Sequence, residues 1–181
     1  KDPTLLCNKA FVAGEWIDAK DGATFDVKNP ARGDVLTTLP DLSIIEVKRA
    51  IDAAEASQRA WAARTGKDRA AILRKWHDLM VANADDLGMI LTAEMGKPIA
   101  EGKGEIMYGA SFIEWFAEEA KRVYGETIPG HLPDKRITVL KQPVGVVASI
   151  TPWNFPNAMI ARKVAPALAV GCTFVARPAK E

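Results

Sequence analysis

The chain has 181 residues, enough for one domain or a little more, and its 24 basic and 23 acidic residues give a formal net charge of +1. With 48% hydrophobic and 26% charged residues, the composition is typical of a folded globular protein and excludes a disordered or fibrous chain. Because domains that bind nucleic acid carry a strong basic excess, the near-neutral charge removes nucleic acid from the expected partners.

The first forty or so residues are expected to form short extended segments joined by turns. Residues 10–17 contain two apolar runs around Gly14, a pattern that predicts a β-hairpin. A second extended stretch is predicted near 24–27. Turn signals fill 29–34, and Pro40 closes this loop-rich N-terminal section.

Helical periodicity begins at Ser43. Ser43 and Glu46 have the spacing of a capping box, in which two side chains satisfy free backbone amides at a helix start. Apolar residues then recur at helical spacing, which predicts a helix over 43–63. Three tryptophans at helical spacing are expected to lie in the core: Trp61, Trp76 and Trp115.

Three further helices are predicted downstream. They begin at Asp68, Asp85 and Pro98, and the last two are expected to stop at Gly96 and at Gly125. The region before residue 133 is therefore predicted to be mainly helical.

Strand patterns dominate the rest of the chain. Residues 136–141 predict a half-exposed strand, and the Val-rich run 144–150 predicts a strand covered on both faces. A helix over 156–171 and a buried strand over 172–176 complete the pattern. Residues 144–177 therefore predict one βαβ unit, the building block of a doubly wound sheet.

Ligands of open α/β sheets bind beyond the carboxyl ends of the strands, which here are 151–155 and 177–181. In the first of these loops two prolines stiffen the chain around Asn154, whose amide could donate to a developing oxyanion. Spacing alone favours a simpler role for Asn154, as a cap of the next helix. Arg162 either binds a carboxylate or forms a solvated basic pair with Lys163, and spacing alone favours the solvated pair.

The second loop contains Arg177 and Lys180, which either hold a ribose or phosphate group or are simply exposed. Two glycine patterns within 96–107 resemble phosphate-binding motifs. We reject the first because its glycines have the wrong spacing and it lacks the Ser or Thr that binds the metal ion. We reject the second because no strand precedes it.

The cysteines and histidines predict neither a metal site nor a disulfide. Cys7 and Cys172 are far apart in sequence, and His77 and His131 are isolated. Cys172 opens a predicted buried strand, so we expect it to be an inert small hydrophobic residue and not a nucleophile.

No membrane partner is expected. The longest nearly apolar run, 164–176, contains Pro166 and Gly171 and is shorter than the roughly 18 to 20 residues needed to cross a bilayer. The first residues lack the apolar core of a secretory signal, so we expect a cytoplasmic location.

Residues 150–156 read Ile-Thr-Pro-Trp-Asn-Phe-Pro and resemble the signature loop of the aldehyde dehydrogenase superfamily. Further landmarks in the family's order extend the resemblance over essentially the whole chain: 8–16, 29–33, 94–98, 128–130, 141–146, 166–172 and 177–179. Within the family, 112–120 and 157–163 are most similar to the succinate-semialdehyde dehydrogenase branch, which also contains glutarate-semialdehyde enzymes.

The resemblance implies an α/β, aldehyde dehydrogenase-like fold. In it, 1–132 would be the hairpin and helices of the N-terminal part of the cofactor-binding domain. Residues 133–143 would be an oligomerisation strand, and 144–181 the first βαβ unit of a Rossmann-like doubly wound sheet. The resemblance also implies a homo-oligomer, either a dimer or a tetramer.

The resemblance further implies oxidation of an aldehyde by NAD or NADP, in which a Cys thiolate attacks the carbonyl and water releases the acid from a thioester. Asn154 matches the residue whose amide stabilises the oxyanion. Arg162 matches the arginine that receives the distal carboxylate of succinate semialdehyde. The residues matching the cofactor site are Ile150, Thr151, Pro152, Trp153, Asn154, Arg177, Pro178, Ala179 and Lys180.

Two departures from the family pattern matter. The family usually has Lys at the place of Arg177, and NAD-preferring members often have Glu at the place of Lys180. A cation there favours a 2′-phosphate, so we expect a preference for NADP.

The family's nucleophilic Cys and general-base Glu match no residue of this chain, so we expect the chain alone to have no dehydrogenase activity. The alternative is a non-catalytic binding or assembly module with the same fold.

Overall fold

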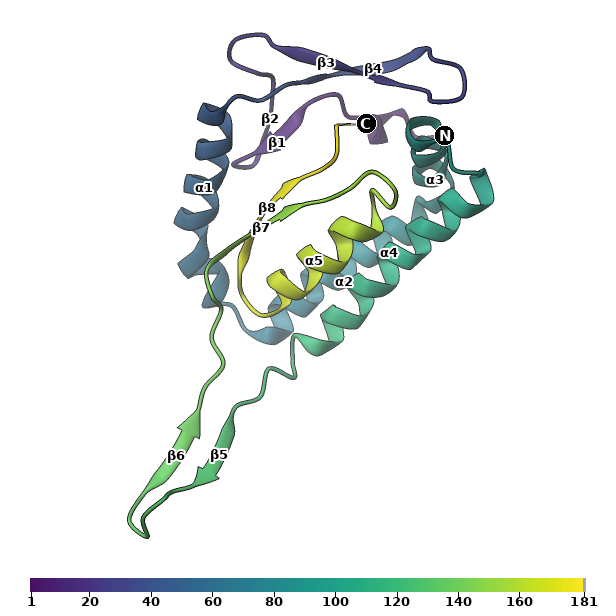
Figure 1. The fold of residues 1–181 in the computed structure, drawn as a ribbon. Helices are drawn as coiled ribbons and strands as arrows, with labels where there is room; N and C mark the ends of the chain where they lie inside the picture. Colours follow the sequence, from purple (N-terminus) through teal and green to yellow (C-terminus); the bar gives the residue numbers. More distant parts are fainter. Residues whose placement is uncertain (181) are drawn as a thin grey trace.

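The computed structural model describes residues 1–180 (Figure 1). A short 3-10 turn at Pro3–Leu5 is followed by two antiparallel hairpins, β1 (Ala10–Val12) with β2 (Glu15–Ile17) and β3 (Thr24–Lys28) with β4 (Val35–Pro40). Four helices follow: α1 (Ile44–Ala62), α2 (Gly66–Ala82), α3 (Ala84–Met95) and α4 (Ile99–Glu119). The chain continues with β5 (Glu126–Pro129), β6 (Arg136–Val139), β7 (Val146–Ile150), α5 (Ala158–Ala169) and β8 (Thr173–Arg177).

The predicted hairpin at 10–17 is confirmed. Ala13 and Gly14 have φ values of 55° and 85°, which the tight two-residue turn between right-twisted strands requires. The rings of Phe11 and Trp16 pair across the hairpin with centroids 5.1 Å apart.

Strand β4 was not predicted within this loop-rich section; it pairs along the length of β3 with an irregularity between Val27 and Lys28. The turn signals at 29–34 connect these two strands.

The capping box at the start of α1 is confirmed. The Ser43 backbone amide donates to Glu46 Oε2 at 2.9 Å, and the Ile45 amide donates to Ser43 Oγ at 3.2 Å. Glu46 also accepts from the Lys20 amide at 3.0 Å, which ties the helix start to the hairpin region. Together these hydrogen bonds lower the pKa of Glu46 to about 2, with the Ser43 hydroxyl the largest cause.

The other helix ends lie at the predicted positions or within a few residues of them. Helix α2 begins after Thr65, whose Oγ1 accepts from the Asp68 amide, and α3 ends as expected at Gly96, which has φ 78°. Helix α4 ends at Glu119 instead of reaching Tyr124, because the chain turns there toward the next strand. The core lies among α2, α3, α4 and α5, and its most buried side chains include Leu73, Ile113 and Ala165.

The three tryptophans expected in the core have different environments. Trp76 packs against the core cluster, and the half-buried Trp61 donates from Nε1 to the Leu168 carbonyl at 3.2 Å. Trp115 is 62% exposed, so the prediction is wrong for this residue. Its face of α4 lines an open cleft instead of packing on another helix.

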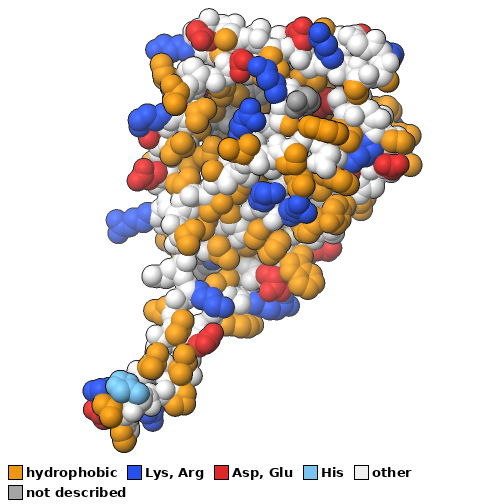
Figure 2. All heavy atoms as spheres, viewed as in Figure 1, with side chains coloured by type: hydrophobic (Ala, Val, Ile, Leu, Met, Phe, Trp, Pro, Cys, Tyr) orange, Lys and Arg blue, Asp and Glu red, His pale blue; other side chains and the backbone are white. Residues whose placement is uncertain are grey.

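Strands β5 and β6 form an antiparallel arm that projects from the body of the molecule (Figure 1). Every residue of both strands is exposed, so the predicted strand at 136–141 is present but is not half covered. Ile128 pairs directly with Ile137. Figure 2 shows hydrophobic side chains along this arm.

The predicted βαβ unit is confirmed, since β7 and β8 are parallel and α5 connects them. The sheet contacts both α1 and α5 (Figure 1). The expectation that β7 is covered on both faces is wrong, because Ser149 is its one fully buried residue and Ile150 is 76% exposed. In the described chain the sheet has two strands, and the helices cover only part of it.

Two side chains join the N-terminal helices to the turn after α5. Gln58 of α1 donates from Nε2 to the Gly171 carbonyl at 2.9 Å, and its Oε1 accepts from the Thr173 amide at 2.7 Å. Arg69 of α2 donates from Nε to the Ala169 carbonyl at 2.9 Å, and burial lowers its pKa. Cys172 is buried, as predicted, but the buried strand predicted over 172–176 is wrong beyond Thr173, because Phe174 and Val175 are half-buried and Ala176 is exposed.

No helix in the described part of the chain is long and apolar enough to cross a membrane. Over residues 1–180, no three His, Cys, Asp or Glu side chains gather in a way that would hold a metal ion.

Candidate functional site

The two predicted loops meet at the carboxyl end of the parallel strand pair. The Thr151 amide donates to the Arg177 carbonyl at 3.2 Å, which joins the end of β7 to the end of β8. This edge is where ligands of α/β sheets bind. Ile150, Pro152 and Trp153 are exposed there, and their role as a cofactor wall stays a prediction.

Two hydroxyl groups at this strand end are buried without a partner. Ser149 Oγ and Thr151 Oγ1 lie two residues apart, and neither forms a hydrogen bond within residues 1–180. A buried hydroxyl without a hydrogen bond is energetically costly, so each such group needs an explanation. These atoms fit a site that receives a polar group, as the predicted cofactor site would.

Asn154 lies in the loop 151–157, between β7 and α5, and its side chain is exposed. The simpler interpretation of Asn154 as a helix cap is wrong. Asn157 occupies the N-cap position of α5 without a side-chain cap, and the amides of Asn157 and Ala158 donate to Glu105 of α4 instead. The Asn154 amide therefore remains available to a ligand at the strand edge.

Glu105 also forms a buried ion pair with Lys97, the residue that follows the Gly96 cap of α3. The Lys97 ammonium lies 2.6 Å from Glu105 Oε2 and donates to the Asn154 carbonyl oxygen at 3.1 Å. Sequence reasoning missed both residues. The 94–98 landmark drew attention to the segment, but no local pattern indicates that these two charges are buried.

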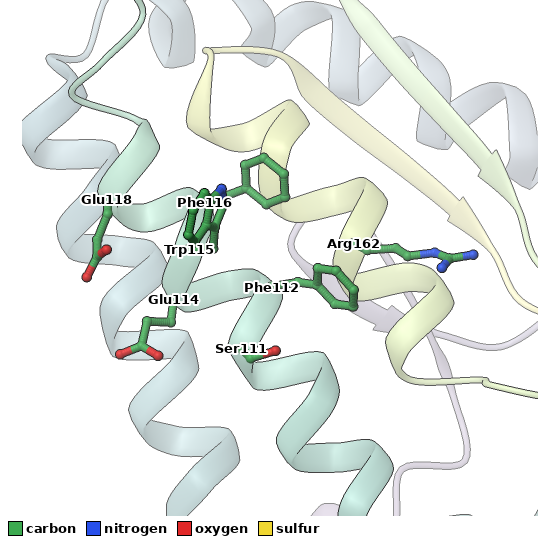
Figure 3. Close-up of a pocket in the computed structure, with 7 residues that line it drawn as sticks. All are labelled: Ser111, Phe112, Glu114, Trp115, Phe116, Glu118 and Arg162. Carbon is green, nitrogen blue, oxygen red and sulfur yellow. The ribbon is translucent and has the colours of Figure 1, made fainter.

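Arg162 of α5 lies beside an open cleft of about 820 Å³ that α4 lines with the rings of Phe112, Trp115 and Phe116 (Figure 3). The Glu114 and Glu118 carboxylates at the cleft are turned away from Arg162 in Figure 3. Their ion pairs to Arg74 of α2 measure 2.7 and 3.2 Å.

Arg162 donates from Nη2 to Met159 Sδ and forms no ion pair with the described residues, whereas its neighbour Lys163 donates to the Met159 carbonyl at 3.2 Å. The cleft therefore offers one exposed guanidinium beside aromatic surface, which suits a small anion with an apolar stem.

The predicted ribose-binding residues lie next to the hairpin β3–β4. Arg177 is exposed. Lys180 Nζ is 2.9 Å from Asp41 Oδ2 and 4.9 Å from the centroid of the Phe25 ring. A phosphate bound by Lys180 would share the ammonium with Asp41, and the roles of residues 177–180 stay predictions.

Comparisons with known proteins agree with the fold. Residues 16–181 match the family model described as "Aldehyde dehydrogenase family". The chain is 59% identical over all 181 residues to glutarate-semialdehyde dehydrogenase of Pseudomonas putida, covering 38% of it. It is 57% identical over 180 residues to succinate-semialdehyde dehydrogenase [NADP(+)] of Escherichia coli, covering 37% of it.

Among solved structures, succinate-semialdehyde dehydrogenase from Burkholderia pseudomallei superimposes with a TM-score of 0.98 at 59% identity. That match covers 99% of this chain and 37% of the other. The chain thus spans a little over a third of the length of the curated relatives that it matches.

Proposed function

The chain belongs to the aldehyde dehydrogenase family, and we propose that it forms the N-terminal part of an NAD(P)-dependent succinate-semialdehyde dehydrogenase. One observation carries the choice of substrate: the exposed guanidinium of Arg162 lies on the helix that follows the Asn154 loop. Succinate semialdehyde has an aldehyde at one end and a carboxylate at the other. The Asn154 amide lies in the loop before α5 and suits the aldehyde end. The Arg162 guanidinium lies on α5 itself and suits the carboxylate end.

The chain's residues would act on both ends of the substrate. The Asn154 amide would donate to the oxygen of the aldehyde as negative charge develops there, a contribution of about 3 to 4 kcal/mol for such donors. Arg162 would bind the carboxylate with two hydrogen bonds. Phe112 would cover the methylene groups from α4.

The cofactor NAD or NADP, when bound, would supply the hydride acceptor. The unpaired hydroxyls of Ser149 and Thr151 support a cofactor at this strand edge. Cys172 is buried in the core and does not serve as the thiol nucleophile. We therefore keep the prediction that the 181 residues alone form no NADPH from an aldehyde. Formation of NADPH by the purified chain would contradict it.

The test of the substrate is Arg162→Ala in the enzyme that contains this chain. Charge-assisted hydrogen bonds are worth about 1.5 to 3 kcal/mol, so kcat/KM for succinate semialdehyde should fall about 10- to 100-fold. Activity on butanal, which has the same carbon count but no carboxylate, should change less than about 3-fold.

The matched control is Lys163→Ala, which removes the neighbouring cation whose side-chain hydrogen bond goes to the Met159 carbonyl. It should leave the preference for the charged aldehyde unchanged. Equal losses on both substrates in Arg162→Ala would remove Arg162 from the substrate site.

A five-carbon substrate is the second candidate, since the Pseudomonas putida relative at 59% identity is named glutarate-semialdehyde dehydrogenase. Both semialdehydes present the same carboxylate to Arg162. The ratio of kcat/KM for the two substrates decides between them, and a ratio of 10 or more in favour of glutarate semialdehyde would replace our assignment.

We also propose that the enzyme is a cytoplasmic homo-oligomer, a dimer or tetramer, and that the arm built on segment 133–143 takes part in its assembly. Support comes from the exposed Ile128, Ile137 and Val139 on a two-stranded element that projects away from the core. Such an arm buries little within its own chain and offers both apolar groups and unpaired strand edges to a second copy.

A further inference from the structure

A buried ion pair lies beneath the loop that carries Asn154. The side chains of Lys97 and Glu105 are 8% and 1% exposed, and their charged atoms are 2.6 Å apart. Every other ion pair among the described residues has at least one side chain that is more than a third exposed. Removing two charges from water is strongly unfavourable, and apolar residues pack helices at least as well. The contacts of this pair therefore require an explanation beyond packing.

The second carboxylate oxygen of Glu105 holds the start of α5. Oε1 accepts from the Asn157 amide at 2.9 Å and from the Ala158 amide at 3.2 Å. Because α5 has no side-chain cap of its own, Glu105 supplies the negative charge that a helix N-terminus favours. The position of the first turn of α5 is thereby fixed by α4.

The ammonium of Lys97 holds the other end of the loop. It donates to the Asn154 carbonyl oxygen at 3.1 Å and lies 3.9 Å from the centroid of the Phe155 ring, within the range of a cation–π contact. Pro152 and Pro156 restrict φ on either side. The peptide group of Asn154 is thus anchored within the loop that follows β7.

We infer that Lys97 and Glu105 are positioning residues, which hold the backbone of 154–158 so that the Asn154 amide points to the place where the oxyanion develops. The inference rests on the proposed function. An oxyanion donor is effective only within about 2.7 to 3.1 Å of the developing charge, so a loop that drifts by an ångström loses most of the benefit.

The experiment is a double-mutant cycle of Lys97→Met and Asn154→Ala in the enzyme that contains this chain. Lys97→Met should lower kcat about 10- to 50-fold with KM within about 3-fold, because the lost interaction is made in the transition state. Asn154→Ala should lower kcat about 100- to 1000-fold. Lys97→Met added to Asn154→Ala should cost less than about 3-fold, because its effect passes through the missing amide.

The matched control is Lys103→Met. Lys103 is also near the start of α4 and pairs with Asp85 at 2.7 Å, but that pair is exposed. This variant should keep kcat within about 2-fold. Equal fold losses for Lys97→Met in both backgrounds, or no loss in either, would overturn the inference. If Lys97→Met does not fold, Glu105→Gln is used in the same cycle, since its oxygen still accepts from the two amides while an NH2 group replaces the oxygen that binds the Lys97 ammonium.

Amide hydrogen exchange separates this inference from the proposed function. Lys97→Met should speed exchange of the Asn157 and Ala158 amides at least 10-fold, while Lys103→Met leaves them unchanged. Unchanged exchange refutes the positioning role. A wild-type enzyme that oxidises no aldehyde refutes the proposed function, and the exchange rates then decide whether the pair holds the loop.

Discussion

Replacing Gly102 with Ala is expected to destabilise the protein, although Ala is the better helix former. A Cβ on Gly102 would lie 2.6 Å from Thr92 Oγ1 and 2.9 Å from the Gly88 carbonyl oxygen. The Thr92 hydroxyl can rotate away, but the carbonyl is fixed within α3, so α3 and α4 must move apart. Such overpacking costs about 1 to 3 kcal/mol. The gain in helix propensity is about 1 kcal/mol, which leaves a net loss of up to about 2 kcal/mol.

Gly104→Ala is the matched control, because a Cβ at Gly104, on the same helix, would meet nothing within 4 Å. This variant should gain about 0.5 to 1 kcal/mol from propensity alone. Urea unfolding followed by far-UV circular dichroism should therefore place the midpoints in the order Gly104→Ala, wild type, Gly102→Ala. Midpoints that both rise would show that the α3–α4 contact yields easily and would refute the packing argument.

Three further predictions concern the cofactor, pH and assembly. Lys180→Glu should lower the ratio of kcat/KM with NADP to that with NAD at least 10-fold, because the cation for a 2′-phosphate is lost; a wild-type enzyme that uses both cofactors equally well argues against the predicted preference. Glu46 has a pKa lowered to about 2 from 4.5, so its stabilising effect is present above pH 4.5 and is lost as the pH falls toward 2. Urea midpoints measured across that window should fall less steeply in Ser43→Ala, and equal slopes would exclude the Ser43 contact as the cause. Ile137→Lys on the arm should lower the oligomer mass measured by light scattering, and an unchanged mass would separate the arm from the interface.

The sequence predicted those elements whose ends are set by nearby residues. The start of α1 depends on a side chain and amides within three residues, and Gly96 ends α3 through its own backbone conformation. The end of α4 was misplaced because apolar spacing continues to Tyr124, whereas the chain leaves the helix at Glu119 to pair as β5 with a strand further on. Strand pairing between distant segments leaves little trace in local periodicity.

The candidate site likewise contains residues that local sequence patterns indicate and residues that they do not. Asn154 and Arg162 were predicted from the strand-end rule and the family resemblance, since both lie close to a recognisable loop. Lys97 and Glu105 have ordinary charged side chains near a helix start, where solvent exposure is the usual outcome. Their burial depends on α5 docking from 52 to 57 positions away in the sequence, which no local pattern contains.

The hydrogen bonds from Gln58 to the start of β8 have a consequence for synthesis of the protein. The amide oxygen of Gln58 binds the Thr173 backbone, 115 positions later in the chain. A ribosome that adds 5 to 20 residues per second would need about 6 to 23 s to produce that partner. Throughout that interval the face of α1 that carries Gln58 lacks its neighbouring strand, so α1 can take its final place only after β8 has been made.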